Sequence, residues 1–289
     1  MYKVAILGCE NSHANNFLKA VLVDKIVTDV EFVGVYSNEP EAAAKLNAEF
    51  GVPVADSYDA FVGKVDGIII TARHGDNHYK YAKPYMECGI PMFIDKPITC
   101  TEEDAKAFME ELKANKVPIS GGSVCVLDDY IQELKQAVAN KTYGEVFGGY
   151  LRAPVMMGSP YGGFFFYSQH LAQVMTEIFG CYPDSVRAYN KGTSVHCVVR
   201  YPGYDVNITY TSDSSVYYAS ISCADAVVGR AYDFAGCFEK EFTGFYRLLK
   251  GQSQTQSYED FFAPVYVLNA IYRSMESGKE EKVNRAEEI

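Results

Sequence analysis

The sequence predicts an α/β protein in two parts: a parallel sheet with helices on both faces, then an α+β part with an open, mostly antiparallel sheet. Short apolar runs alternate with helical patterns over residues 1–122, which is the order of β-α-β units. Runs rich in Tyr, Val and Thr, joined by hairpin turns, dominate residues 123–289. The length of 289 residues agrees with two domains, since domains average roughly 150 residues. We therefore predict domains over 1–122 and 123–289.

Alternating strands and helices make up the first part. We predict strands over residues 3–8, 31–36, 67–71, 92–95 and 117–120, and helices over residues 39–50, 77–87 and 101–115. The first helix has acidic residues in its first turn and Gly51 just beyond its end, which is typical of helix termini. Ligands of parallel sheets bind at the carboxyl ends of the strands. The segments to inspect are therefore 8–13, 36–38, 71–74 and 95–97.

The second part contains several β-type segments. We predict strands over residues 146–152, 185–189, 194–201, 204–212 and 216–223, and helices over residues 128–138, 168–179 and 258–277. Such strand runs favour a mostly antiparallel sheet with helices on one face. We expect an uncovered aromatic face that makes a homodimer or homotetramer, formed by Tyr201, Tyr204, Tyr210, Tyr217 and Tyr218. The alternative is that these tyrosines face water.

Composition argues against several functional classes. The net charge is −11 and Lys and Arg do not cluster, so we expect neither a nucleic-acid nor a membrane partner. No apolar run approaches the ~18–20 residues of a membrane helix, and the N-terminal run is too short for a signal peptide. The eight cysteines are at least 12 residues apart and form no metal-ligand cluster. These features predict a cytoplasmic protein with free thiols and no metal.

The first strand ends in a turn that partly matches a dinucleotide-binding motif. The pattern G-x-G-x-x-G would place glycines at 8, 10 and 13, and this chain has Gly8, Glu10 and His13. The second glycine normally lets the backbone approach a pyrophosphate, so the Glu10 carboxylate predicts weaker dinucleotide binding. The alternative is a turn of the same fold that binds no dinucleotide.

The end of the second strand bears on the form of the cofactor. An acid at this point holds the ribose of NAD, and an Arg favours the phosphate of NADP. This chain has Ser37 and Asn38, which can hydrogen-bond either form, so both NAD and NADP remain open. Asn38 is also a candidate N-cap of the helix over 39–50.

Two further residues are candidates for proton transfer or substrate binding. Lys96 follows the fourth strand, between Asp95 and Pro97, at the ligand-bearing edge. The alternative for Lys96 is a solvated turn lysine. His170 opens a helix after two glycines and three phenylalanines, where a histidine can bind a ligand or transfer a proton. The alternative for His170 is a histidine that packs two domains together.

These segments, in this order, resemble the Gfo/Idh/MocA oxidoreductases. The similarity lies in VAILG, in TARHGDNHYKYAKPYMECGIPMFIDKPIT and in GGFFFYSQHLAQVMTEIFG, and it extends over nearly the whole chain. It implies a Rossmann-type dinucleotide-binding domain, NAD or NADP as cofactor, and oxidation or reduction of a hydroxyl or carbonyl on a sugar or cyclitol. By this resemblance Lys96 orients the substrate hydroxyl and assists proton transfer, and His170 matches the histidine of the substrate domain.

Three positions depart from the family pattern. Glu10 replaces the second glycine, Asp95 replaces the Glu of a Glu-Lys-Pro motif, and Phe166 replaces an acid four residues before the histidine. Tyr167 can supply a hydroxyl near the missing acid. Two alternatives to a dehydrogenase therefore remain open: a non-catalytic or weakly nucleotide-binding protein of the same fold, and a glycoside hydrolase that uses NAD.

The candidate site combines catalytic residues with a larger set around the cofactor. The catalytic candidates are Lys96, His170 and Tyr167. The cofactor candidates lie at strand ends and in the turns and helix starts after them: Gly8, Glu10, Asn11, Ser12, His13, Ser37, Asn38, Thr71, Ala72, Arg73, His74, His78, Asp95 and Lys96. We expect Lys96 and His170 to face one cleft between the two domains.

Overall fold

The computed structural model describes the whole chain, residues 1–289, as two compact units. The N-terminal unit comprises residues 1–99, 104–122 and 236–258, and the C-terminal unit comprises the remainder. The predicted domain 123–289 is therefore not one unit, because residues 236–258 return to the N-terminal unit. A division of labour between cofactor and substrate domains stays a prediction.

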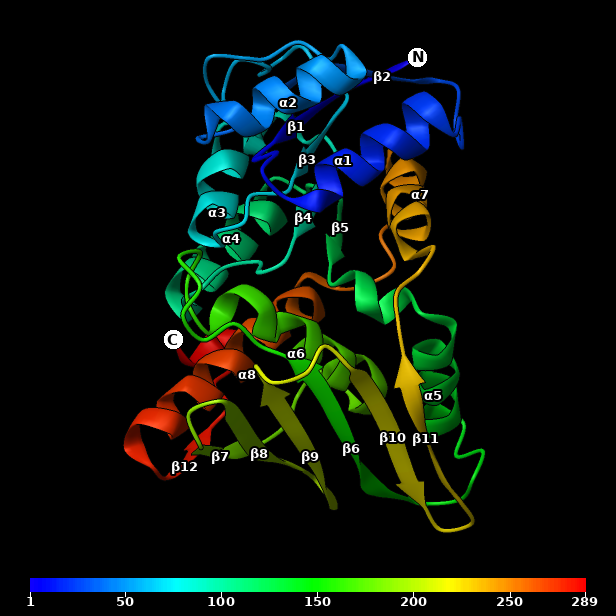
Figure 1. Cartoon of the computed structure of the whole chain (residues 1–289), viewed down its shortest axis with the longest axis vertical. Coiled ribbons are helices and arrows are strands. Elements are labelled where there is room, and N and C mark those ends of the chain that lie inside the picture. Colours follow the sequence, from blue (N-terminus) through cyan, green and yellow to red (C-terminus); the bar gives the residue numbers. More distant parts are fainter. The chain divides into compact units, whose positions relative to one another are not determined.

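The N-terminal unit is built on a five-stranded parallel sheet with the order β2-β1-β3-β4-β5 (Figure 1). Its strands are β1 (Tyr2–Leu7), β2 (Val30–Tyr36), β3 (Gly67–Ile70), β4 (Met92–Asp95) and β5 (Ile119–Gly122). Its helices are α1 (Ser12–Leu18), α2 (Pro40–Phe50), α3 (Asp76–Ala82), α4 (Glu102–Ala114) and α7 (Cys237–Leu249). All residues of β3 and β4 are buried, as expected for a sheet covered on both faces.

Several helix ends differ from the prediction. The helix predicted over 77–87 divides into α3 and a 3₁₀ segment, Lys83–Cys88, and α1 continues as a π-helical segment, Lys19–Val23. Gly51 ends α2 with a φ of +72°, as predicted. In α2 only Ala43 and Leu46 are buried, so the helix covers the sheet with one narrow stripe.

Helix α7 was not predicted from the sequence. It packs against α1, with the ring of Phe242 5.7 Å from that of Phe17. Its buried positions recur every three or four residues, but one of them is Glu241. A charged residue at an apolar position interrupts the pattern by which a core-facing helix is detected.

The C-terminal unit contains a seven-stranded sheet with the order β11-β10-β6-β9-β8-β7-β12. Its strands are β6 (Val146–Pro154), β7 (Ser185–Asn190), β8 (Ser194–Tyr201), β9 (Tyr204–Thr211), β10 (Tyr217–Cys223), β11 (Val227–Tyr232) and β12 (Glu280–Lys282). All pairs are antiparallel except β6 with β9. Its helices are α5 (Asp129–Ala139), α6 (Phe165–Phe179) and α8 (Tyr258–Ser277). The two sheets confirm the predicted fold class.

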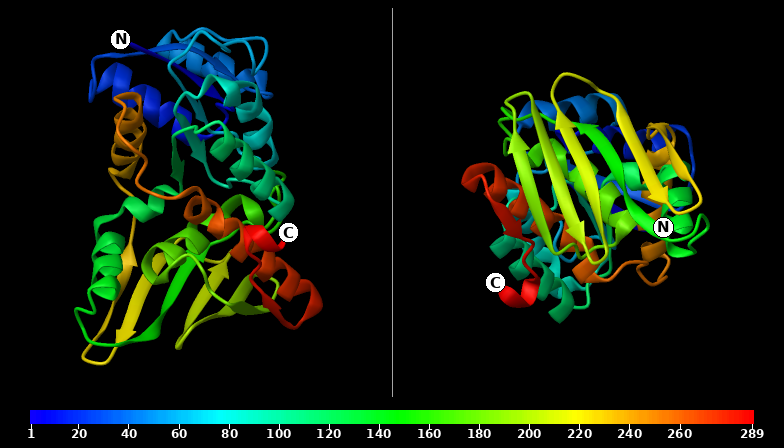
Figure 2. Two further views of the ribbon diagram at one scale, coloured as in Figure 1. Left: turned by 180° about the vertical axis from the view of Figure 1, so that it is seen from behind. Right: turned by 90° about the horizontal axis from the view of Figure 1, so that it is seen from below.

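One face of the seven-stranded sheet is uncovered (Figure 2). The predicted composition of that face is wrong, because Tyr201, Tyr210 and Tyr217 are buried. The ring of Tyr210 contacts Phe164 at the start of α6, and the Tyr201 hydroxyl donates to the carbonyl of Gly180. Strand pairing brings Tyr204 opposite Tyr201, with the two rings stacked. Period-two alternation therefore directs these tyrosines toward the helices.

Tyr218 is the exception among these tyrosines. It follows Tyr217 in β10, so it points to the opposite face, and its ring lies 6.0 Å from that of Tyr150 on β6. Tyr150 is 38% exposed. The uncovered face thus contains a smaller aromatic surface than the sequence predicts.

Candidate functional site

Gly8 fixes the turn after β1 to both neighbouring strands. Its φ is +76°, and a Cβ at this position would lie 2.5 Å from the Cα and N of Ala72. The backbone N–H of Gly8 donates to the carbonyl of Tyr36 at 2.7 Å, and Thr71 Oγ1 donates to the carbonyl of Gly8 at 2.9 Å. Only glycine permits this conformation and this close approach.

Glu10 turns its carboxylate toward the strand ends. The side chain is buried, and its Oε2 accepts a hydrogen bond from Ser37 Oγ at 2.6 Å. Its Oε1 accepts from the backbone N–H of Arg73 at 3.0 Å. Glu10 therefore joins the end of β2 to the end of β3, across the end of β1.

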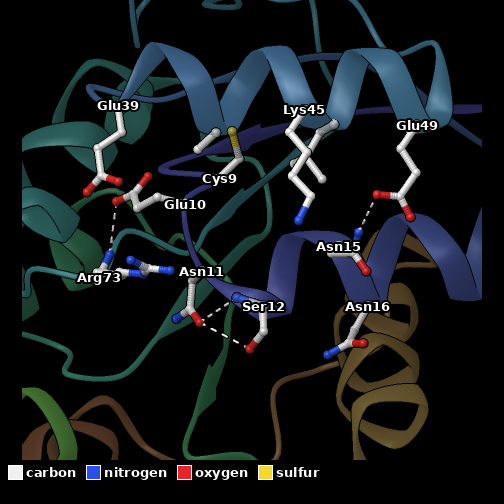
Figure 3. A pocket seen from close by; sticks show the side chains of 12 residues that line it. Cys9, Glu10, Asn11, Ser12, Asn15, Asn16, Glu39, Lys45, Glu49 and Arg73 are labelled. Carbon is white, nitrogen blue, oxygen red and sulfur yellow. Dashed lines mark hydrogen bonds between the residues drawn. The ribbon is translucent and has the colours of Figure 1, made fainter.

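A pocket of about 560 Å³ opens beside this carboxylate, between the turn after β1, helix α1 and helix α2 (Figure 3). Small-molecule sites typically have volumes of roughly 300–1,000 Å³. Glu10, Asn15, Lys45 and Arg73 are among the residues that line the pocket. Such polar and charged groups suit ribose hydroxyls and phosphates, so the residues present fit one half of a dinucleotide.

Ser37 is held at the end of β2 by two hydrogen bonds. Its hydroxyl donates to Glu10 and accepts from the backbone N–H of Glu39 at 3.0 Å. The N-cap of α2 is Glu39, and Asn38 is exposed. The alternative role of Asn38 as N-cap is therefore wrong. Glu39 takes that position, and the Ser37 hydroxyl accepts a hydrogen bond from its backbone N–H.

Histidines support the loop after β3. His78 is fully buried, and its Nε2 lies 2.8 Å from the carbonyl of Ala72. A carbonyl only accepts, so Nε2 carries the proton. Burial lowers the pKa of His78 to about 4, which leaves the ring neutral. His74 is half-buried, and its Nδ1 accepts from the backbone N–H of Asp76 at 3.3 Å.

Asp95 and Lys96 are both buried at the end of β4. Asp95 Oδ1 accepts from the backbone N–H of Lys96, and its Oδ2 accepts from Asn11 Nδ2, both at 2.7 Å. Asn11 also caps α1, because its Oδ1 accepts from the backbone N–H of Ser12. The alternative of Lys96 as a solvated turn lysine is wrong, since only 4% of the residue is exposed.

His13 lies between two buried acids. Its Nδ1 is 3.1 Å from Asp95 Oδ2, and its Nε2 is 3.3 Å from Glu241 Oε2 on α7. Burial lowers the pKa of His13 to about 4 and raises the pKa of Asp95 to about 6. Burial also raises the pKa of Glu241 well above its ordinary value, against the opposing charge of Lys96.

The shifts in pKa of His13, Asp95 and Glu241 indicate how the three groups are charged. At neutral pH His13 is neutral and Asp95 is ionised, and burial favours the protonated form of Glu241. The ammonium of Lys96 and the hydrogen bonds from Asn11 and from the Lys96 backbone stabilise the Asp95 carboxylate. Lys96 therefore has a fixed counter-charge beside it.

The C-terminal unit holds His170 in α6. The residue is 4% exposed, and its Nδ1 lies 2.7 Å from Ser123 Oγ and 3.5 Å from Cys125 Sγ. The backbone N–H of Ser123 donates to Gln173 Oε1 at 2.8 Å, one turn beyond His170 on the same helix. The contacts with Ser123 and Cys125 hold the Nδ1 side of the ring in place.

Tyr167 is the nearest aromatic neighbour of His170 in α6, with ring centroids 5.0 Å apart. Phe166, in the place of the family's acid, packs its ring 5.4 Å from that of Tyr161. On its Nδ1 side, His170 is hydrogen-bonded to the hydroxyl of Ser123.

The structure gathers most N-terminal site candidates at the strand ends. One group joins Glu10, Ser37 and Arg73, and the other joins Asn11, His13, Asp95 and Lys96. Ser12 and Asn38 are exposed. Ser123 and Glu241 are not among the site residues that the sequence predicts. Sequence spacing indicates neither residue. Ser123 lies 47 residues before His170, and Glu241 lies over a hundred residues after Asp95.

No helix of the chain has both the length and the apolar character needed to cross a membrane.

Residues 2–123 match the sequence model of the Gfo/Idh/MocA oxidoreductase family, described as an NAD-binding Rossmann fold. UDP-N-acetylglucosamine 3-dehydrogenase from Acidithiobacillus ferrooxidans is 28% identical over 107 residues, which are 37% of this chain. The match spans about a third of the length of that relative, 34%.

Two solved structures show that the similarity in fold covers both units. Myo-inositol 2-dehydrogenase from Lactobacillus plantarum has a TM-score of 0.85 at 13% identity, covering 98% of this chain and 99% of that one. Scyllo-inositol dehydrogenase from Lactobacillus casei, solved with NAD(H) and scyllo-inositol, has a TM-score of 0.83 at 16% identity, with the same coverage. At such identities the comparison establishes the fold.

The family match covers the segment that carries the turn after β1 and the Asp95-Lys96-Pro97 motif. It confirms the resemblance seen in the sequence, together with the nicotinamide dinucleotide as the cofactor class of the family. We conclude that residues 2–123 of this chain resemble the NAD-binding Rossmann domain of the Gfo/Idh/MocA oxidoreductase family.

Proposed function

We propose that the chain is an NAD(P)-dependent oxidoreductase that acts on a hydroxyl or carbonyl of a small polyhydroxylated molecule of the sugar or cyclitol class. The observation that carries this proposal is the buried Asp95–Lys96 pair at the carboxyl end of β4, next to the turn after β1. Support comes from relatives named as inositol and UDP-N-acetylglucosamine dehydrogenases.

The catalytic roles are assigned by residue chemistry. When bound, the nicotinamide supplies the hydride acceptor or donor. Lys96 donates a hydrogen bond to the reacting oxygen and assists its proton transfer, because an ammonium beside a fixed carboxylate is a charged donor. In the C-terminal unit, His170 and Tyr167 bind and orient the substrate. That Lys96 and His170 face one cleft stays a prediction.

The proposal is tested by incubating the full chain with NAD⁺ or NADP⁺ and a panel of inositols, hexoses and nucleotide sugars, followed by absorbance of the reduced nicotinamide. We expect turnover with at least one polyol or sugar, and turnover that is at least about a hundredfold slower after Lys96→Met. Cleavage of an aryl glycoside in the presence of NAD⁺ would support the hydrolase instead. Saturable nucleotide binding without either reaction would support the non-catalytic alternative.

The proposed enzyme is a cytoplasmic homo-oligomer. All eight cysteines are free, which suits a reducing compartment. The uncovered face of the seven-stranded sheet, with Tyr150 and Tyr218 side by side, is the proposed contact between copies. No nucleic-acid partner is proposed, given the net charge of −11.

A further inference from the structure

The end of β2 lacks the charged residue that usually selects the form of a nicotinamide dinucleotide. In this fold an Asp or Glu after the second strand accepts hydrogen bonds from the adenosine ribose, and an Arg nearby accommodates a 2′-phosphate. Here β2 ends at Tyr36 and is followed by Ser37 and Asn38. Ser37 is buried and already bonded to Glu10 and to the backbone of Glu39, whereas Asn38 is exposed.

A carboxylate nevertheless reaches the end of β2, from a different element. Glu10 belongs to the turn after β1, and its Oε2 lies 2.6 Å from Ser37 Oγ. The backbone N–H of Arg73 holds the other oxygen at 3.0 Å. These two bonds, from two strand ends, fix the carboxylate at the wall of the pocket that Figure 3 shows.

The fixed carboxylate retains the capacity to bind a diol. An ionised carboxyl has about four acceptor sites, and the protein donates to two of those on Glu10. A ribose with free 2′- and 3′-hydroxyls offers two donors. Hydrogen bonds to charged acceptors are the strong ones, and prior fixation reduces the entropy lost on binding.

The charges around the pocket oppose an additional phosphate there. Glu39 lies at the same end of the pocket as Glu10, and Glu49 lies at the far end with Asn15 (Figure 3). The cationic side chains of the lining are Lys45 and Arg73. A phosphate placed against Glu10 and Glu39 would meet like charge at short range.

We propose that Glu10 replaces the missing acid of β2 as the acceptor for the adenosine ribose hydroxyls, and that it thereby selects the nucleotide without a 2′-phosphate. This inference rests on the proposed function, since it concerns the same cofactor site. It makes the Glu10 carboxylate a contact that strengthens cofactor binding, whereas the sequence alone predicts that this carboxylate weakens it.

The test is calorimetric titration of the full chain with NADH and with NADPH, for wild type, Glu10→Gln and Glu49→Gln. We expect wild type to bind NADH at least about tenfold more tightly than NADPH. Glu10→Gln should weaken NADH binding about tenfold or more and bring the ratio of the two dissociation constants close to one. The matched control Glu49→Gln removes a carboxylate from the same pocket away from Ser37, so it should leave the ratio within about twofold.

Each other outcome overturns the inference. If Glu10→Gln tightens NADH binding, Glu10 repels the cofactor, as the sequence predicts. An equal change in Glu49→Gln would assign the selectivity to overall pocket charge. A wild-type chain that prefers NADPH, or binds both nucleotides equally, would also refute the role of Glu10 in selectivity. The proposed function as an oxidoreductase would then still stand. Only a wild-type chain that binds neither nucleotide would refute both. Circular dichroism of each variant verifies the fold.

Discussion

At the scale of single residues, Lys96 is the side chain on which the proposed chemistry depends most. Losing a general acid–base typically lowers turnover by about 10²–10⁴-fold. Lys96→Met removes the ammonium at similar length, so with a turned-over substrate it should lower kcat by that amount. His170→Asn keeps a polar group at a position held by Ser123, and we expect its effect mainly in KM.

Steady-state kinetics of both variants provide the measurement. Lys96→Arg keeps the charge and serves as a control for loss of the buried cation. Equal losses of kcat in Lys96→Met and His170→Asn would indicate a coupled pair. A fully active Lys96→Met enzyme would contradict the proposed role of Lys96.

Gly8 gives a second prediction at this scale, with Gly51 as its matched control. Their φ values are +76° and +72°, but a Cβ meets the Ala72 backbone at Gly8 and nothing within 4 Å at Gly51. Both alanine variants should lose about 1–2 kcal/mol from the positive φ. Gly8→Ala should lose several kcal/mol in total, because the strand ends must also separate. Urea unfolding of the two variants measures the difference, and equal losses would contradict a close approach of β1 and β3.

Residue types at the strand ends could be predicted from the sequence, but their partners could not. Gly8, Lys96 and the Asp95 before it stand at positions that the alternation of strands and helices identifies. The contact of Glu10 with Ser37 depends on a side-chain rotamer, which spacing does not report. Ser123 reaches His170 because two elements fold together in the C-terminal unit.

At the scale of elements, α7 brings Glu241 into the N-terminal unit, and this predicts a pH dependence of stability. The pKa of Glu241 is raised in the folded chain, so folding favours its protonated form. The contribution of Glu241 to the free energy of unfolding is complete below its ordinary pKa of 4.5. It is lost as the pH rises from there toward the pKa of Glu241 in the folded chain. Glu241→Gln cannot ionise and should lack that loss.

Thermal unfolding between pH 5 and pH 8 measures the effect. Relative to wild type, Glu241→Gln should gain about 1–3 kcal/mol over this range, which corresponds to several degrees. Glu239→Gln, on the same helix but exposed, is the control and should follow wild type. If Glu241→Gln and wild type change in parallel with pH, Glu241 is ionised in the folded chain.

The strongly patterned elements were predictable, and the exceptions have physical reasons. Helix α8 and strand β8 have the predicted bounds, because each carries a clear apolar period between turn residues. Strands β11 and β12 were missed: β11 is mostly exposed and β12 has only three residues. Edge strands bury little, so they leave a weak hydrophobic signal.

At the scale of the whole molecule, the uncovered sheet face predicts an assembly. Tyr218→Asp places a charge beside Tyr150 and should convert a dimer or tetramer to monomers of 32.1 kDa in multi-angle light scattering. Val23→Asp is the control: it adds the same charge at an exposed apolar position of the N-terminal unit and should leave the assembly unchanged. A wild-type chain that is monomeric across working concentrations would refute the contact.

We expect the strand ends of the N-terminal unit to bind a nicotinamide dinucleotide. The most direct test is a titration of the wild-type chain with NADH, followed by the emission of the nicotinamide itself, since the chain has no Trp. We predict a saturable change in emission with one site per chain and a dissociation constant in the range of about 1 μM to 1 mM that is usual for enzyme ligands. An emission that rises only in proportion to the concentration of NADH, and likewise of NADPH, up to millimolar concentrations would contradict binding of a nicotinamide dinucleotide at these strand ends.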